Sequence, residues 1–258
     1  MAGEVRVERH LLRSREVLIA RGAFGPLFAE YLDHSRRWVG EPAGLVLQLM
    51  QHGLAAAGLY LTFRALDENT AWTVNFSEPP LNIFITTDSR AGTVTGRYFE
   101  EHVATVDHNR IFVQSVRNIG QPQLSSVEVK GFDMLSIFEQ YFARSEQLPA
   151  RFFAGENDTY TMLSALPGVD LDWISGVTAA DLPALFAAPD LRSLEERVVT
   201  FACRCDERRI HKVVRALFAD RVEELFRGEE RVEVQCPRCG HAYWMTRADF
   251  AGEAPPDA

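Results

Sequence analysis

Four cysteines are the residues of this sequence that could do chemistry by their type and spacing. They form two close pairs, Cys203-Arg-Cys205 and Cys236-Pro-Arg-Cys239, separated by 30 residues. If folding brings the pairs together, their thiolates can occupy the corners of a tetrahedron, which is the geometry of a closed structural zinc site. The sequence therefore predicts one Zn²⁺ per chain in the reduced protein, with Cys203, Cys205, Cys236 and Cys239 as its ligands.

Other uses of these residues fit the sequence less well. Two structural disulfides would need an oxidising compartment. Residues 1–24 carry charges throughout and lack the uninterrupted apolar segment of a secretory signal, so we expect a cytoplasmic protein. An iron–sulfur cluster is a weaker alternative. His241 could also serve as a ligand, although four cysteines already complete the coordination of zinc.

The first pair also indicates redox chemistry. A Cys-X-Cys spacing holds two sulfurs close enough for a small, strained and therefore reversible disulfide. Sulfurs in a zinc site are deprotonated, which makes them nucleophilic towards peroxide or hypochlorite. The alternative is a zinc ion that only holds a small domain together.

Oxidation would remove most of the stabilisation of this region. Binding of a structural zinc contributes about 10–16 kcal/mol to the folding of so small a unit. Disulfides within each pair would close very short loops and constrain the chain much less than the metal does. We expect oxidation to unfold the C-terminal unit and to loosen the segment before it. Apolar residues such as Phe186, Leu191, Val198 and Val199 would then be exposed.

The spacing of apolar residues predicts the elements that position the cysteines. Residues 1–64 read as mostly helical, with a buried helix over residues 45–63. Runs rich in β-branched and aromatic residues then predict five strands. They are residues 71–76, 81–87, 92–98, 109–116 and 124–129. Helical spacing returns at residues 134–142, and another strand is expected at residues 151–153.

Prolines and glycines interrupt residues 166–197, which predicts short, weakly packed helices. Further on, Asp206 is expected to cap a helix, and Gly228 to end a second, short one. The predicted apolar face of the first helix is Ile210, Val213, Val214 and Leu217. A small hairpin should surround the second cysteine pair.

These elements predict an α+β protein in four parts. The first is a mixed helix and sheet domain over residues 1–175. A helical, redox-sensitive linker over residues 176–200, a zinc-binding domain over 201–250 and a flexible tail over 251–258 come after it.

Composition and charge exclude several partners. The chain is 47% hydrophobic and 24% charged, as globular proteins are, and its net charge of −9 disfavours nucleic acid and anionic lipid. Residues 42–63 carry no formal charge, but Gln48, Gln51 and His52 would be costly in lipid. We therefore expect neither a membrane nor a nucleic-acid partner.

The main alternative function is a zinc ribbon that binds nucleic acid or a fixed protein partner. Nine basic and eight acidic residues lie between Cys203 and Cys239, whereas a groove-binding finger would be clearly basic.

No pattern of catalytic residues supports an enzyme. The sequence has no Gly-X-Ser-X-Gly elbow, no phosphate-binding glycine loop and no His-Glu-X-X-His motif. His102 and His108 flank Asp107 without matching an acid–base motif. We expect His52 to be a satisfied polar residue of a packed helix, and His211 to lie on a helix surface.

The sequence resembles the heat-shock protein 33 family of redox-regulated holdase chaperones. The resemblance rests on both cysteine pairs and on the string Tyr141-Phe-Ala-Arg-Ser-Glu-Gln-Leu-Pro-Ala150, which is similar to a helix-end signature of the family. The order of mixed domain, linker and zinc unit extends it over nearly the full chain. Two segments depart from the family: Ser77-Glu-Pro-Pro80 replaces a Gly-Asp-Gly-Pro turn, and residues 108–121 differ.

The resemblance implies an ATP-independent chaperone that is zinc-bound and inactive when reduced. It implies that oxidation joins Cys203 to Cys205 and Cys236 to Cys239, releases zinc and unfolds the linker. The exposed surface would then bind unfolding client proteins. Members of the family dimerise when activated, so a homodimer is the expected active form.

Overall fold

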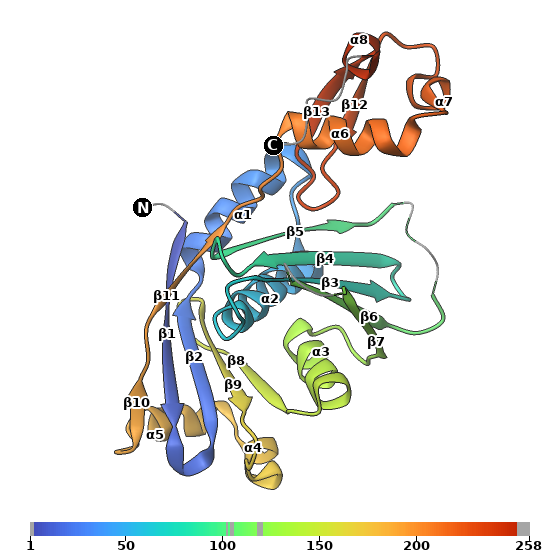
Figure 1. Cartoon of the computed structure of the whole chain (residues 1–258). Helices are drawn as coiled ribbons and strands as arrows, with labels where there is room; N and C mark the ends of the chain where they lie inside the picture. The colour runs from blue at the N-terminus through green and yellow to red at the C-terminus, as the bar shows by residue number, and fades with distance from the viewer. Residues whose placement is uncertain (1–2, 102, 104–105, 118–120, 252–258) are drawn as a thin grey trace.

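The computed structural model describes residues 3–101, 103, 106–117 and 121–251. A large sheet with helices against it makes up most of the molecule, and a small unit with its own two-stranded sheet stands at one end (Figure 1). The predicted α+β class is confirmed.

The large sheet has two parts that meet at a single short strand. Its spatial order runs β7 (Gln123–Glu128), β6 (Arg110–Arg117), β3 (Glu68–Phe76), β4 (Leu81–Asp88), β5 (Thr93–Phe99), β11 (Arg197–Phe201), β1 (Glu4–Leu12), β2 (Val17–Ala23), β9 (Thr159–Ala165) and β8 (Ala150–Ala154). The strand β10 (Leu191–Ser193) pairs with β1 beside this path. β11 runs parallel to β5 and antiparallel to β1, so it joins the β3–β7 half to the β1, β2, β8 and β9 half.

Helices fill the space between the two halves. The central helix α2 (Gly44–Leu61) contacts β4 and β5 of one half and β2 and β9 of the other. Two shorter helices, α1 (Gly25–Trp38) and α3 (Met134–Tyr141), pack beside it. Among the described residues α2 alone has the length and hydropathy of a membrane span, and most of it is buried inside the protein. The predicted buried helix is confirmed, since a helix that is apolar on all sides belongs in a core.

Residues 4–23 differ from the prediction of mostly helix over residues 1–64: they form the hairpin of β1 and β2, with a 3₁₀ turn (Arg13–Arg15) between the strands. Val5 and Val7 are buried while Arg6 between them is exposed, which is the two-residue period of a strand. The outward-facing positions of this alternation carry charged side chains such as Arg6 and Glu8. The five strands predicted over residues 71–129 and the helix after Gly131 are present, with ends shifted by a few residues.

The segment predicted as a linker is only partly helical. Its helices are α4 (Leu171–Gly176), a 3₁₀ turn (Ala179–Asp181) and α5 (Leu182–Phe186). They pack on a second apolar cluster from the β1, β2, β8 and β9 half, in which Val17, Ile19 and Leu163 are fully buried. Residues 191–201 then form strands β10 and β11, and Val199 of β11 belongs to the main core.

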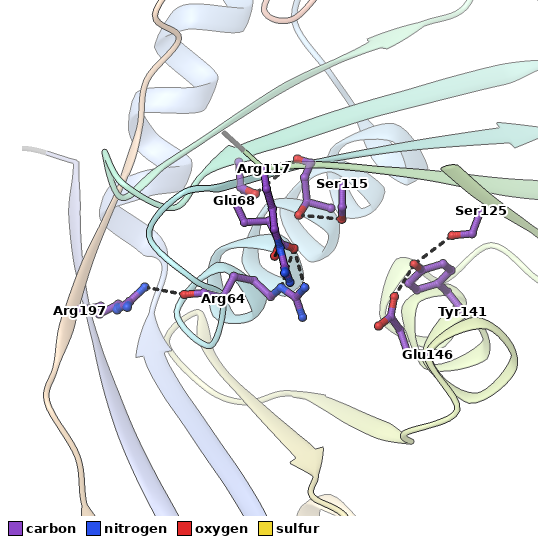
Figure 2. A network of polar contacts seen from close by, with 10 residues as sticks. Arg64, Glu68, Ser115, Arg117, Ser125, Tyr141, Glu146 and Arg197 are labelled. Carbon is purple, nitrogen blue, oxygen red and sulfur yellow. Dashed lines mark hydrogen bonds and ion pairs between the residues drawn. The ribbon is translucent and has the colours of Figure 1, made fainter. Parts of the chain in front are cut away.

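A buried ion-pair network fixes the C-terminal end of α2 to the sheet (Figure 2). The Glu68 side chain is only 1% exposed and accepts hydrogen bonds from Arg64 Nε at 2.7 Å and Arg117 Nε at 3.1 Å. Figure 2 also shows Arg197 of β11, whose guanidinium donates to the carbonyl oxygen of Arg64 at 3.3 Å. The carbonyls at the end of the central helix are therefore capped from β11.

The string from Tyr141 to Ala150 leads from α3 into β8 through a π-helical turn (Phe142–Glu146). The Tyr141 hydroxyl lies 3.2 Å from Ser125 Oγ of β7 and donates to Glu146 Oε1 at 2.8 Å (Figure 2). Burial raises the pKa of Tyr141 to about 12. This neutral hydroxyl connects the helix end to the edge strand of the sheet.

Removal of the Glu68 carboxylate should lower the free energy of unfolding. Glu68→Ala leaves two guanidinium groups without their buried partner, and we expect the free energy of unfolding to fall by about 1–3 kcal/mol in urea titrations, because the Arg64 and Arg117 side chains stay partly solvated. Glu128→Ala, at an exposed position on β7, is the control and should change it by less than about 0.5 kcal/mol. Equal effects of the two substitutions would show that the network does not stabilise the fold.

Candidate metal centre

The two cysteine pairs are held by different elements. Cys203 and Cys205 lie in the short connection between β11 and the helix α6 (Glu207–Phe218). Asp206 begins this helix as predicted, because its carboxylate accepts the Arg209 N–H at 2.8 Å. Cys236 and Cys239 lie in the turn of the predicted hairpin, between β12 (Arg231–Gln235) and β13 (Ala242–Thr246).

Backbone hydrogen bonds shape the turn that carries the second pair. Gly240 N–H donates to the Cys236 carbonyl and Cys236 N–H to the His241 carbonyl, both at 2.9 Å. Gly240 has a φ of 82°, in the left-handed region that glycine adopts without strain. The turn therefore points both sulfurs to one side of the hairpin.

The four sulfurs meet in one cluster. All four Sγ atoms lie within 4.8 Å of one another, with Cys203 to Cys236 at 3.8 Å and Cys205 to Cys239 at 3.6 Å. With Zn–S bonds of about 2.3 Å, the edges of a tetrahedral site measure about 3.8 Å. The donor set and its dimensions therefore fit a tetrahedral metal ion such as zinc.

Crowding of the thiols separates their pKa values. Hydrogen bonds from neighbouring thiols lower the pKa of Cys205 to about 7, with Cys203 as the largest cause, and hold that of Cys236 far below its usual value. The same contacts raise the pKa of Cys203 and of Cys239. Four crowded thiols cannot all ionise together without a cation, so metal binding and loss of the thiol protons are coupled.

A small apolar core surrounds the cluster. Cys236 and Cys239 are buried among Phe226, Met245 and Val234, together with the short helices α7 (Val222–Phe226) and α8 (Arg247–Ala251). The Tyr243 hydroxyl donates to Cys205 Sγ at 3.2 Å. Since this core is small, much of the stability of the unit must come from its sulfur cluster.

Two predictions about α6 need correction. Of the predicted apolar face, Ile210 is buried and Val214 packs against the core of the unit, whereas Val213 and Leu217 are 52% and 60% exposed. His211, predicted on the surface, is buried, and its Nε2 donates to the Trp244 carbonyl at 3.0 Å. The helix thus turns Ile210, His211 and Val214 towards the core of the unit, and the buried imidazole donates to a carbonyl of β13.

The cluster also touches the large domain. His34 of α1 donates from Nε2 to the Cys239 carbonyl at 2.8 Å, and burial lowers the pKa of His34, which favours this neutral donor. Arg97 of β5 donates to the Cys236 carbonyl at 3.4 Å. Arg204, between the first two cysteines, pairs with Asp88 of β4 at 2.7 Å. The metal-binding turn is thus docked on α1 and on one edge of the sheet (Figure 1).

The other histidines have structural contacts. The ring of His241 stacks on Trp38, at a centroid distance of 4.1 Å, and on Tyr243, at 4.6 Å, and among the described residues His241 is not part of the group that converges on the sulfur cluster. His52 Nδ1 lies 2.9 Å from Asp133 Oδ1, as expected for a satisfied polar residue. His102 lies outside the described residues. In the described part of the chain, the cysteines are the group of metal-ligand type that converges.

Sequence reasoning missed the residues that dock the cluster. His34 and Arg97 lie 205 and 139 positions from the cysteines whose carbonyls they contact. A single His on a helix and a single Arg on a strand carry no local pattern. Phe201 packs its ring against Tyr31 and His34. It ends a run of β-branched residues, Val198 to Thr200, which is a pattern that predicts a strand.

Comparison with known proteins relates this arrangement to one family. A family model described as "Hsp33 protein" matches residues 44–246. A 33 kDa chaperonin of Synechococcus sp. is 24% identical, over 94% of this chain and 80% of its own length. The 33 kDa chaperonin of Caldanaerobacter subterraneus is 25% identical over 53% of this chain and 56% of its own length. For this relative and for others like it, the alignment spans about half the length of the relative.

A solved structure has the same fold along the whole chain. The 33 kDa chaperonin (heat shock protein 33 homolog) of Thermotoga maritima superposes with a TM-score of 0.70, covering 97% of both chains at 14% identity. The family model spans well over half of the sequence and includes all four cysteines. The chain therefore belongs to the Hsp33 family.

Proposed function

We propose that this protein is an ATP-independent holdase chaperone that oxidation activates. In the reduced state Cys203, Cys205, Cys236 and Cys239 hold one Zn²⁺, and the chain is idle. The convergence of four sulfurs at tetrahedral spacing, just beyond the end of a strand of the main sheet, carries the proposal. Membership of the Hsp33 family and the chaperonin names of its relatives support it.

The metal, when bound, supplies a charge that keeps four thiolates together. Cys203 and Cys205 continue from β11, while Cys236 and Cys239 belong to the hairpin. Holding the pairs together therefore anchors the end of β11 to a folded unit. A site of this type contributes about 10–16 kcal/mol, which is comparable to the whole stability of a domain.

Oxidation would remove the four ligands. For each disulfide, two thiolates give two electrons to one molecule of hydrogen peroxide, which takes up two protons and leaves as water. By the family resemblance, the bonds formed are Cys203–Cys205 and Cys236–Cys239. Neither bond connects β11 to the hairpin, so the C-terminal unit would lose the constraint that holds it folded.

Loss of this anchor would expose apolar surface. The helices α4 and α5 cover one face of the β1, β2, β8 and β9 half, with Phe186 and Leu191 packed on it. Leu12, Ile19 and Leu163 beneath them are fully buried. Unfolding of residues 176–200 would bare these side chains to unfolding client proteins in the cytosol. We propose a homodimer as the active form, again from the family resemblance.

The zinc affinity of two variants should distinguish a metal ligand from a residue that only lies near the site. We expect Cys239→Ser to weaken zinc binding by more than roughly 100-fold, since the loss of a contact to a ligand alone costs about 10–100-fold. His241→Ala should keep one zinc per chain, because the His241 ring stacks on Trp38 and Tyr243 and is not part of the converging sulfur cluster. Metal analysis during chelator titration measures both; zinc loss in the His241 variant with retention in the Cys239 variant would contradict the ligand assignment.

The proposed activity is tested on one sample that is reduced, then treated with peroxide under mild heat. We expect one zinc per chain to leave and, only afterwards, the aggregation of a thermally unfolding substrate to be suppressed. Light scattering and a metal-sensitive dye record the two events. Retention of zinc, or its loss without protection of the substrate, would contradict the proposal and leave the metal site with a structural role alone.

A further inference from the structure

Strand β11 is held by backbone pairing on both of its sides. On one side residues 197–200 pair with β1, from Glu4–Thr200 to Val7–Arg197, and on the other side residues 200 and 201 pair with Thr93 and Val94 of β5. On the β5 side, Thr200 N–H donates to the Gly92 carbonyl at 3.0 Å and Ala202 N–H to the Val94 carbonyl at 3.1 Å. A single five-residue strand thus fills a slot whose two walls present backbone donors and acceptors.

The floor of the slot is apolar. Val199 is fully buried, beside Gly58 of α2 and the ring of Phe24. Phe201 packs edge-on against Tyr31 at a centroid distance of 5.6 Å. The neighbouring residues point the other way: Val198 is 45% exposed and Thr200 is partly exposed. Alternate side chains of the strand therefore enter the floor, and the others face outward.

The strand in this slot also leads directly into the first cysteine pair of the proposed redox switch. Only Ala202 separates Phe201 from Cys203, and the Arg197 cap on α2 is lost when the strand leaves. Release of β11 would leave two unpaired strand edges facing each other across an apolar floor. Unpaired edges of this kind bind extended polypeptide through its main chain.

We propose that the slot between β1 and β5, which β11 fills in the reduced state, binds an extended segment of an unfolded client as an added strand. The inference rests on the proposed function and names its binding site. Backbone pairing makes recognition tolerant of sequence, and the floor selects apolar side chains at alternate positions. β11, with Val199 and Phe201 inward, is the internal competitor for this site.

The wall at Gly92 offers a way to narrow the slot without changing the four cysteines. Gly92 has a φ of 66°, and a Cβ added there would lie 2.6 Å from the Val198 carbonyl oxygen. Gly131 also has a positive φ, of 85°, but nothing lies within 4 Å of an added Cβ. Gly92→Ala and Gly131→Ala therefore impose the same backbone strain, and only the first obstructs a strand in the slot.

The first experiment measures amide hydrogen exchange in the full-length protein, with carboxymethylated, permanently unfolded lactalbumin as the client. On oxidation we expect residues 4–7, 93–94 and 197–201 to lose protection. On addition of client, residues 4–7 and 93–94 should regain it while 197–201 stay unprotected. Edges that remain protected throughout, or that stay unprotected in the client complex, would overturn the proposal.

The second experiment compares client affinity of the oxidised variants. We expect Gly92→Ala to raise the dissociation constant roughly tenfold, about the effect of one lost hydrogen bond. Gly131→Ala should match the wild type. All three proteins are compared after complete zinc release, because the added Cβ at Gly92 also obstructs β11 in the reduced state. If Gly92→Ala binds client as well as Gly131→Ala, the client binds elsewhere. If the oxidised wild type binds no client at all, the proposed function itself fails.

Discussion

Backbone pairing of β11 on both of its sides is the interaction on which the rest of the structure depends. It joins two half-sheets that otherwise share only the helices between them. It also places Arg197 on the end of α2 and Val199 in the main core. A strand of five residues has few hydrogen bonds of its own, and we propose that its hold on the sheet relies on the C-terminal unit that comes next in the chain.

That C-terminal unit is too small to be stable without help. The core around Phe226 and Met245 is slight, and four sulfurs occupy much of its centre. The unit is docked through His34, Arg97 and Asp88, which contact the backbone of the metal-binding turn or Arg204 beside it. The state of the sulfurs and the pairing of β11 are therefore linked by a very short piece of chain, which is the physical basis of the proposed switch.

The sequence predicts the parts of this arrangement that are local. The cysteine spacing is enough to anticipate the cluster, and the β-branched runs of residues 71–129 are enough for their strands. The hairpin of β1 and β2 is missed because the helical spacing after residue 24 sets the prediction for residues 1–64, although the alternation of Val5, Arg6 and Val7 is itself the period of a strand. The predicted linker includes most of β11 because prolines and glycines precede this strand. Its partners, β1 and β5, lie more than 100 residues away in the chain, and nothing in the local pattern identifies them.

The most direct test of the link between sulfurs and strand records both in one sample during oxidation. Zinc release is measured with a metal-sensitive dye, and amide exchange of residues 197–201 is sampled at the same times. The account predicts that β11 loses protection with the time course of zinc release, while α2 in the core stays protected. Release of zinc with β11 still protected would contradict it, because the metal site would then hold only the C-terminal unit.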